Sequence, residues 1–282
     1  MSDYKVLIIG LGEIGHSNAE YMTSLGLRVD GYDISEGAIQ RAISDGVIRK
    51  KATSFSGYDF HVVCVSTHRQ ENMFMPYLNG LYEVAERLGR EATPGTLLGI
   101  DSTIPRGTTA RIENMLQHKL HVVHVPHRYF AQEKTEHGVC QMRVIGAPRK
   151  CCLEHGKKFY GDVMKIPLFQ VSSPDIAELT KVAENAKRFV DIAFAEDLKM
   201  VCDDSGLSFA ELRESINTKW NTKILEAKDG IGGHCLPKDS QMLLDLSRQF
   251  LQSSIIEAAK KVDSEYRVHI MKMISQKAAM IE

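Results

Sequence analysis

The chain has 282 residues, with 35 basic and 36 acidic side chains and a net charge of -1. This length suffices for two domains with a sizeable core, and the balanced charge excludes the basic footprint of a nucleic-acid-binding or membrane-surface protein. No apolar run approaches the roughly 18 to 20 residues of a membrane helix, and the N-terminal "MSDYKVLIIG" lacks the features of a signal peptide. Six cysteines without a C-x-x-C pair predict free thiols in a reducing cytoplasm.

Short β-branched runs alternate with helical patterns along the first half of the chain. The runs are "KVLIIG" (5–10), "RVDGYD" (28–33), "HVVCVS" (61–66), "TLLGIDST" (96–103), "LHVVHVP" (120–126) and "MRVIGA" (142–147). Near-continuous apolar strands separated by helices indicate a parallel sheet that is covered on both faces. We therefore predict a doubly wound α/β Rossmann domain over residues 1–172.

A glycine-rich turn follows the first of these strands. "GLGEIG" has the G-x-G-x-x-G spacing between a strand and a helix, and an acidic residue ends the second strand. In such a turn the glycines permit tight folding and close approach of a pyrophosphate, and the carboxylate bonds the ribose hydroxyls and repels a 2′-phosphate. The turn thus predicts a site for NAD rather than NADP, built from Gly10, Gly12, Glu13, Ile14, Gly15 and Asp33.

Two later turns lie at the carboxyl ends of strands, on the ligand side of such a sheet. They are "VSTHR" (65–69) and "DSTIP" (101–105). For the first of them, simple turn chemistry is the alternative. We expect further cofactor contacts from Val65, Ser66, Thr67, Ser102 and Thr103.

Four histidines recur every three residues, at His118, His121, His124 and His127. In a strand over 120–126 the side chains alternate between faces, so His121 and His124 point to opposite sides and cannot share one ion. We therefore predict no metal site from this series. His127 differs because it follows Pro126 at the carboxyl end of the strand, where ligand contacts gather.

The second half of the chain is predicted to be helical. Pro174 begins a segment that runs to Ser205 without another Gly or Pro, and Gly206 marks its end. Its apolar residues cover more than one stripe, so we expect burial between layers or between subunits and a homodimer through helix 174–205. Further helices are expected over "SFAELRESI", "TKILEAK", "KDSQMLLDLSRQF" and the segment from Ser253, making residues 173–282 an all-helical domain with a long central helix.

Two polar features stand out in this helical half. Lys181 and Asn185 are four residues apart and share one face of the long helix, where burial without partners would be costly; a surface or interface pair is the alternative. Cys235 lies in the glycine-rich "DGIGGHCLPKD", beside Lys238 and Asp239. Its alternative role is that of a small residue in a glycine loop.

These motifs resemble the nucleotide-sugar 6-dehydrogenases, which include UDP-glucose, UDP-N-acetylmannosamine and GDP-mannose dehydrogenases. The resemblance is carried by "GLGEIG", "VSTHR", "DSTIPRGTT", "AELTKVAENAKRFVDIAFAEDL" and "GIGGHCLPKD". The sequence G-G-H-C-L-P is similar to the branch that acts on N-acetylated sugars. The resemblance implies oxidation of a primary alcohol of a sugar or nucleotide sugar to a carboxylate, in two hydride transfers to NAD⁺ with a cysteine-bound thiohemiacetal and thioester.

The resemblance also implies a role for individual residues. Cys235 is the nucleophile, Lys181 and Asn185 are polar groups beside the reacting carbon, and Asp239 helps to activate water, with Thr103 near the reaction centre. From its place in the glycine-rich loop, we also expect Lys238 to reach the cofactor phosphates. The expected substrate contacts are His127, Arg128, Lys181, Asn185 and Gly233.

Two departures from the family pattern keep alternatives open. The family usually has a glutamate where this chain has His127, and the chain ends after a segment that resembles the helix before the family's C-terminal nucleotide-binding domain. We expect a short form with a different substrate, a partner chain that supplies the missing half, or a fragment. A single-step dehydrogenase like the β-hydroxyacid or 6-phosphogluconate enzymes, and a non-catalytic NAD-binding subunit, are the alternative functions.

Overall fold

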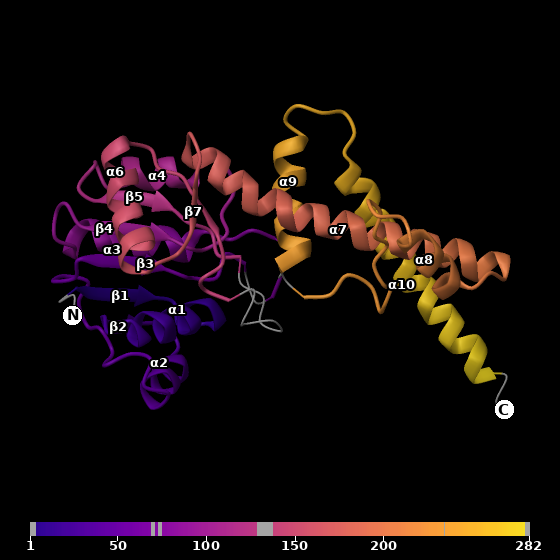
Figure 1. Ribbon diagram of the computed structural model, residues 1–282, viewed down its shortest axis with the longest axis horizontal. Coiled ribbons are helices and arrows are strands. Elements are labelled where there is room, and N and C mark those ends of the chain that lie inside the picture. The colour runs from indigo at the N-terminus through magenta and orange to yellow at the C-terminus, as the bar shows by residue number, and fades with distance from the viewer. Residues whose placement is uncertain (1–3, 69–70, 73–74, 129–137, 234, 280–282) are drawn as a thin grey trace. The chain divides into compact units, whose positions relative to one another are not determined.

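The computed structural model describes residues 4–68, 71–72, 75–128, 138–233 and 235–279, so Arg69 and His234 of the quoted motifs lie outside the described residues (Figure 1). The chain divides into two compact units. The first comprises residues 1–69 and 77–181, and the second comprises residues 70–76 and 182–282. This division places residues 174–181 with the first unit, and the domain assignment 1–172 and 173–282 stays a prediction.

The first unit is built on a parallel sheet with the strand order β2-β1-β3-β4-β5. The strands are β1 (Lys5–Ile9), β2 (Arg28–Tyr32), β3 (Phe60–Val63), β4 (Leu97–Ile100) and β5 (His121–His124). An isolated parallel bridge between Gly31 and Lys51 extends the sheet beyond β2. These bounds confirm the predicted parallel sheet.

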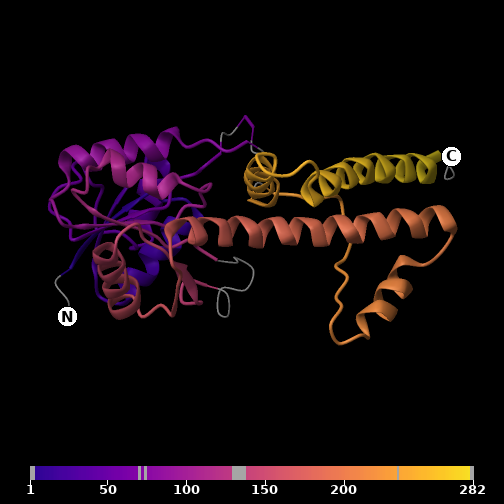
Figure 2. The same ribbon diagram turned by 90° about the horizontal axis from the view of Figure 1, so that it is seen from above.

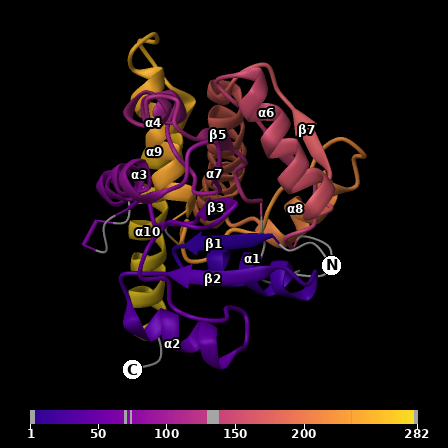
Figure 3. The same cartoon turned by 90° about the vertical axis from the view of Figure 1, so that its left-hand side faces the viewer.

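Helices cover both faces of this sheet. Alternate residues of β1 point to opposite faces, so each face presents apolar side chains to a different set of helices. Val6 and Ile8 pack with α1 (Glu13–Ser24), α2 (Glu36–Ser44), α6 (Lys150–Gly156) and the π-helical η2 (Lys157–Val163). Leu7 and Ile9 pack with α3 (Asn79–Glu91) and α4 (Thr108–Met115) on the other face (Figure 3). The near-continuous apolar strands thus belong to a doubly wound fold, as predicted.

The segment "MRVIGA" forms a strand outside the main sheet, which corrects the prediction. β6 (Arg143–Ile145) pairs in parallel with β7 (Leu168–Gln170) as a separate two-stranded sheet. The link to β5 is a single antiparallel bridge, in which the His124 and Gly146 backbones exchange hydrogen bonds of 2.9 and 3.1 Å. Because β6 runs against the direction of β5, it cannot continue the parallel ladder.

The long helix α7 spans Pro174–Ser205 and ends before Gly206, whose φ of 71° takes the left-handed conformation that terminates helices. Its first turns are held within the first unit by Glu178, a buried carboxylate that accepts bonds from the Gly107 and Thr109 N–H groups at 2.6 and 2.7 Å. The predicted helix is confirmed. Its apolar surface is only partly buried, since Phe194 is 53% and Val201 58% exposed.

The second unit contains α8 (Phe209–Asn217), α9 (Cys235–Ser247) and α10 (Ile255–Ala279) (Figure 2). Its core joins Phe189 and Ala193 of α7 to Ile231 and to Ala259 of α10. The segment "TKILEAK" is not helical, contrary to the prediction. Seven residues rarely nucleate a helix, and here the Asn217 side chain bonds both the N–H and the C=O of Ile224 instead.

α9 also begins earlier than predicted, at Cys235 instead of Lys238. Pro237 is compatible with this start because the N–H groups of a first helical turn have no intrahelical partner.

Within the described parts of the chain, no helix combines the length and the apolar character that crossing a membrane requires.

Candidate functional site

The register of the parallel sheet brings the predicted cofactor residues to one edge. Ile9 is aligned with Tyr32 and Val63, and Val63 with Ile100, so the strands β1 to β4 end in one row. The glycine turn, Asp33 and the turns after β3 and β4 all follow this row directly. In doubly wound sheets ligands bind outside the carboxyl ends of the strands.

The three glycines of the turn meet different constraints. Gly10 has φ 94°, and an added Cβ would lie 2.6 Å from the Cys64 carbonyl oxygen. A Cβ on Gly15 would lie 1.8 Å from the Gly10 carbonyl oxygen. Gly12 is exposed with an ordinary φ of -66°, and a Cβ there would meet nothing within 4 Å. Backbone geometry and packing therefore explain Gly10 and Gly15, but they do not explain Gly12.

Asp33 closes the turn from the end of β2. Its carboxylate accepts the Leu11 N–H at 2.6 Å and the Ser35 N–H at 2.8 Å. Glu13 and Ile14 open α1 beside it, the first exposed and the second half-buried. The predicted cofactor residues after β1, at the start of α1 and after β2 thus lie together, because the bond from Leu11 to Asp33 joins the two turns.

The turns after β3 and β4 are joined by hydrogen bonds. Thr67 Oγ1 donates to the Thr103 carbonyl at 2.8 Å, and Ser102 Oγ donates to the Val65 carbonyl at 2.7 Å. Ser66 is exposed, and its hydroxyl bonds the His68 ring at 3.1 Å. The structure therefore brings together all five residues predicted in these turns.

A buried polar network lies behind this edge, and sequence reasoning missed it. Asp101 accepts hydrogen bonds from Arg143 (2.8 Å), Asn18 (2.9 Å) and Tyr160 (2.5 Å). Each of these side chains is at most 2% exposed. Burial raises the pKa of Asp101, and the three donors oppose that rise. The available signal was a charged residue inside an apolar strand pattern, as at Asp101 and Arg143.

His127 joins this network from the carboxyl end of β5. Its Nε2 lies 2.6 Å from Nη2 of Arg143 and 3.2 Å from Oδ1 of Asn18. Because a guanidinium can only donate, the shorter contact favours the lone pair on Nε2 and the proton on Nδ1. Burial, aided by the charges of Arg143 and Lys181, holds the pKa of His127 well below its usual range. The imidazole is therefore neutral at pH 7. Arg128 beside it is half-buried and donates to the Met142 carbonyl at 3.3 Å.

The second unit contains a compact polar group around α9. Cys235 is exposed and is the first residue of the helix, while Lys238 and Asp239 in the same turn are 4% and 1% exposed. Lys238 Nζ lies 2.9 Å from Asp239 Oδ1, and the Asn185 amide donates to the other oxygen. Three of the predicted residues, Asn185, Lys238 and Asp239, are thus in direct contact.

The remaining predicted residues, Lys181 and Gly233, lie on α7 and in the loop before α9. Lys181 lies one helical turn before Asn185 on α7, half-buried, and Gly233 is exposed with φ 74°.

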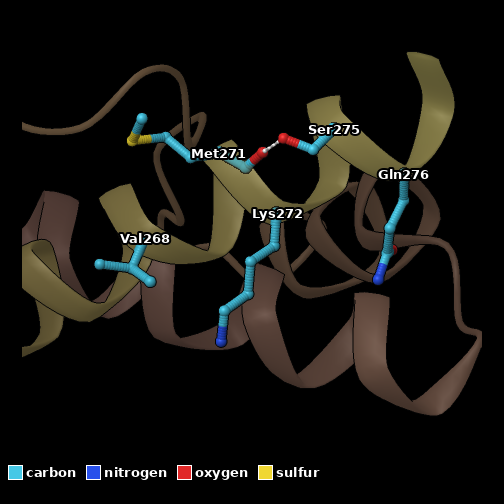
Figure 4. A pocket seen from close by; sticks show the side chains of 5 residues that line it. All are labelled: Val268, Met271, Lys272, Ser275 and Gln276. Carbon is cyan, nitrogen blue, oxygen red and sulfur yellow. Dashed lines mark hydrogen bonds between the residues drawn. The ribbon is translucent and has the colours of Figure 1, made fainter. Parts of the chain in front are cut away.

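A shallow pocket lies on the surface of α10, where Ser275 donates to the Met271 carbonyl at 2.9 Å (Figure 4). Its lining residues are Val268, Met271, Lys272, Ser275 and Gln276, none of which was predicted to act in the site.

Comparison with known proteins covers most of the chain. A sequence profile described as "UDP-glucose/GDP-mannose dehydrogenase family, central domain" matches residues 175–265. The UDP-N-acetyl-D-mannosamine dehydrogenase of Methanococcus maripaludis is 25% identical over 94% of this chain and 66% of its own length. The chain therefore spans about two thirds of the length of that relative.

Solved structures give the same picture. The UDP-D-ManNAc dehydrogenase of Pyrococcus horikoshii matches with a TM-score of 0.84 and 25% identity, over 96% of this chain and 71% of that one. The 3-hydroxyisobutyrate dehydrogenase of Mycobacterium tuberculosis matches with a TM-score of 0.72 over 95% of this chain and 94% of that one. At 15% identity the second likeness is one of fold alone.

The parallel sheet with its glycine turn, followed by a helical region around one long helix, defines a Rossmann-like α/β protein with a helical extension. Residues 175–265 match the central domain of the UDP-glucose/GDP-mannose dehydrogenase family. The chain is homologous to nucleotide-sugar dehydrogenases over most of its length.

Proposed function

We propose that the protein is an NAD-dependent oxidoreductase that converts a primary alcohol of a UDP-sugar, or a related sugar, into a carboxylate in two oxidations. The observation that carries this proposal is the arrangement around α9. An exposed thiol, Cys235, begins the helix, and its first turn holds Asp239 in contact with Lys238 and Asn185. A one-step alcohol oxidation has no use for a nucleophile, whereas a two-step oxidation uses one to hold the aldehyde.

The glycine turn supports NAD as the cofactor. Gly12 is required neither by its backbone angle nor by any neighbour within 4 Å, so the open space beside it is best explained by a ligand that approaches the backbone. The N-terminus of α1 follows at once, and helix N-termini favour phosphate groups. Asp33 adds a negative charge that disfavours the 2′-phosphate of NADP. The residues present therefore fit NAD.

The proposed chemistry centres on Cys235. Bound NAD⁺ would accept a hydride from the substrate carbon in each oxidation. After the first, the Cys235 thiolate adds to the aldehyde carbon, so that a C–S bond forms and the carbonyl oxygen becomes the hydroxyl of a thiohemiacetal. After the second, water attacks the resulting thioester, the C–S bond breaks, and the carboxylate leaves as the thiol is restored.

The neighbouring residues stabilise the charges that this sequence creates. In the proposal, Lys181 and Asn185 bind the oxyanion that forms when sulfur adds to the carbonyl, and Asp239 orients the attacking water. Cys235 itself begins a helix, where the peptide dipoles favour the thiolate. Thr103 lies by this proposal near the reaction centre, and Lys238 near the cofactor phosphates.

His127 changes the acid–base character of the proposed site. The family usually has a glutamate at this position, but here a neutral imidazole faces Arg143. A neutral imidazole can position a substrate hydroxyl or a water without adding negative charge. We assign His127 a substrate-positioning role, together with Arg128 and Gly233.

We also infer a homodimer that forms through α7. Phe194 and Val201 are seven residues apart, so they share one face of the helix, and both are more than half exposed. A second copy of α7 would cover this face. The expected partners are thus the sugar or nucleotide-sugar substrate and a second copy of the chain.

A single-step β-hydroxyacid type of reaction is the second candidate. Its support is the fold shared over nearly the whole length of the 3-hydroxyisobutyrate dehydrogenase. That reaction would not require Cys235, which provides the means to separate the two candidates.

The test is the stoichiometry of NADH and product. The purified chain is incubated with NAD⁺ and either UDP-N-acetylmannosamine or UDP-glucose, and NADH and carboxylate are counted. We expect two NADH per carboxylate, loss of turnover by about a thousandfold or more in Cys235→Ser, and normal turnover in Cys140→Ser, which removes another exposed thiol. One NADH per product with an active Cys235→Ser variant would favour the single-step candidate. Binding of NAD⁺ without any reduction would favour a non-catalytic subunit.

A further inference from the structure

A cluster of sulfur and nitrogen atoms lies at the edge of the sheet opposite to the glycine turn. His121 is the first residue of β5, and Cys151 and Cys152 lie in the first turn of α6. One ring nitrogen of His121 and both sulfur atoms lie within 4.8 Å of one another. Because the cofactor turns follow the last residues of the strands, this cluster is separate from them.

The His121 ring has an unused ligand atom. Its Nδ1 is buried and has no hydrogen-bond partner among the described residues. The ring is held by His155, which stacks on it with centroids 3.7 Å apart and planes 15° apart. His155 is held in turn, since its Nδ1–H donates to the Cys151 carbonyl at 2.8 Å. A buried polar atom without a partner is costly, so its retention suggests a ligand.

Each other member of the histidine series uses one ring nitrogen elsewhere, although Nε2 of His124 is also buried without a partner among the described residues. His118 Nδ1 contacts Glu113 at 2.7 Å, and His124 Nδ1 donates to the Ile100 carbonyl at 3.0 Å. His127 accepts a bond from Arg143. His121 is thus the member of the series that meets the two thiols.

We propose that His121, Cys151 and Cys152 bind a thiophilic divalent cation of the Zn²⁺ class. Two thiolates and one imidazole form a ligand set typical of zinc, with Zn–S of about 2.3 Å and Zn–N of about 2.0–2.1 Å. Ligand atoms at these lengths around a tetrahedral ion are about 3.5–3.8 Å apart. A span of 4.8 Å therefore needs to close by about 1 Å, which small side-chain rotations supply.

The three residues of the cluster differ in burial, which determines the side from which an ion could reach them. Cys152 is fully buried, His121 is partly buried and Cys151 is exposed, so an ion would enter from the side of Cys151. Three protein ligands leave a fourth position for water. The ion would cross-link the start of β5 to the start of α6 and would act on stability, independently of the chemistry proposed for Cys235.

The test uses metal binding in place of activity. The chelator-treated, reduced protein is titrated with Zn²⁺ and, separately, with Co²⁺, whose thiolate charge-transfer absorption reports sulfur ligands. Because Cys235 is an exposed thiol that could bind zinc by itself, the Cys235→Ser variant serves as the background. We expect this Cys235→Ser background protein to bind about one Zn²⁺ or Co²⁺ ion per chain and, with Co²⁺, to show the thiolate charge-transfer absorption band.

Cys151→Ser in this background is the decisive variant, because an exposed residue can lose its sulfur without disturbing the core. We expect zinc affinity to fall by more than about a hundredfold and the cobalt–thiolate band to weaken, whereas Cys140→Ser changes neither. Zinc also raises the melting temperature of the background protein but not that of Cys151→Ser. Failure of the background protein to bind Zn²⁺, or equal affinity in Cys151→Ser, would overturn the proposal.

Discussion

Nη2 of Arg143 lies 2.6 Å from Nε2 of His127, inside a network in which Arg143 also pairs with the buried Asp101 at 2.8 Å. The guanidinium must donate to the imidazole, which fixes the ring proton on Nδ1. Protonation of Nε2 would set two donors against each other at this distance. The contact therefore keeps His127 in one tautomer and in the neutral state.

We first predict that His127 stays neutral across the pH range in which histidine usually titrates, because burial and the charges of Arg143 and Lys181 lower its pKa. Nitrogen-15 spectra of labelled histidine should show a constant Nδ1–H tautomer for this ring across that range. Any acid limb in the pH profile of kcat/KM should remain in His127→Gln, at a position within about 0.3 pH units of the wild type. A limb that disappears in the variant would contradict this prediction.

The glycine turn provides a matched pair of variants. Gly12→Ala places a methyl group in space without neighbours at an allowed φ, so the melting temperature should be unchanged while the affinity for NAD⁺ falls by about tenfold or more. Gly15→Ala places its methyl group against the Gly10 carbonyl and should destabilise the fold itself. Calorimetric titration with NAD⁺ and thermal unfolding separate the two effects. Unchanged affinity in Gly12→Ala would remove the main support for the cofactor site.

Substitutions of the buried Lys238 and Asp239 should have non-additive effects on the free energy of unfolding. Asp239→Asn removes a carboxylate that faces a 4% exposed ammonium at 2.9 Å, at an expected cost of about 3–5 kcal/mol in the free energy of unfolding. Adding Lys238→Met should recover part of this loss, giving a coupling energy of about 1–3 kcal/mol. Urea unfolding of the wild type, Asp239→Asn, Lys238→Met and the double variant measures this coupling energy. Strictly additive effects would show that the two charges do not depend on each other.

Glu196 should make stability depend on pH. Its carboxyl group is fully buried on α7, and neither oxygen has a hydrogen-bond partner in the described part of the chain. Burial, with repulsion from Asp263, raises its pKa from 4.5 to about 7. The folded state therefore keeps a proton that the unfolded state releases, so this contribution to stability is complete below about pH 4.5 and is lost as the pH rises through about 7.

Glu196→Gln should remove that dependence. We expect the stability of the variant relative to the wild type to increase by about 2–3 kcal/mol between pH 5 and pH 8, measured by urea unfolding at both values. The exposed Glu214→Gln is the control and should show no such change. An equal difference between Glu196→Gln and the wild type at both pH values would show that Glu196 is ionised in the fold.

Assembly is expected to depend on the exposed face of α7. Phe194→Glu combined with Val201→Glu should convert the proposed dimer into a monomer, because both changes put charge on one exposed face of α7. Light scattering coupled to size-exclusion chromatography gives the mass directly. Leu207→Glu, at a residue that is 62% exposed beyond the end of α7, should leave the dimer intact. A dimer that survives the double change would place the interface elsewhere.

Local patterns in the sequence determined much of the fold. The sequence alone predicted the apolar strands of the sheet, the turn formed by Gly10, Gly12 and Gly15, and the bounds of the helix 174–205. These features could be predicted because strand periodicity, glycine turns and helix ends depend on residues close in the chain. The same locality explains why the turns after β3 and β4 were found, since parallel strands end at one edge. The failure at "TKILEAK" shows the limit, because Asn217 competes for the backbone of a segment too short to form a helix alone.

Tertiary structure decided what depends on residues far apart in the chain. Asn18, Asp101, Arg143 and Tyr160 meet only after four separate elements pack together, and that packing turns His127 into a neutral imidazole. The direction of β6 and the start of α9 at Cys235 were settled in the same way, by backbone pairing and helix formation in context. The sequence by itself thus determined which residues follow the strands and which helix carries Lys181 and Asn185. Long-range burial and hydrogen bonding determined the charge states and contacts of these residues, because both depend on neighbours that no local pattern specifies.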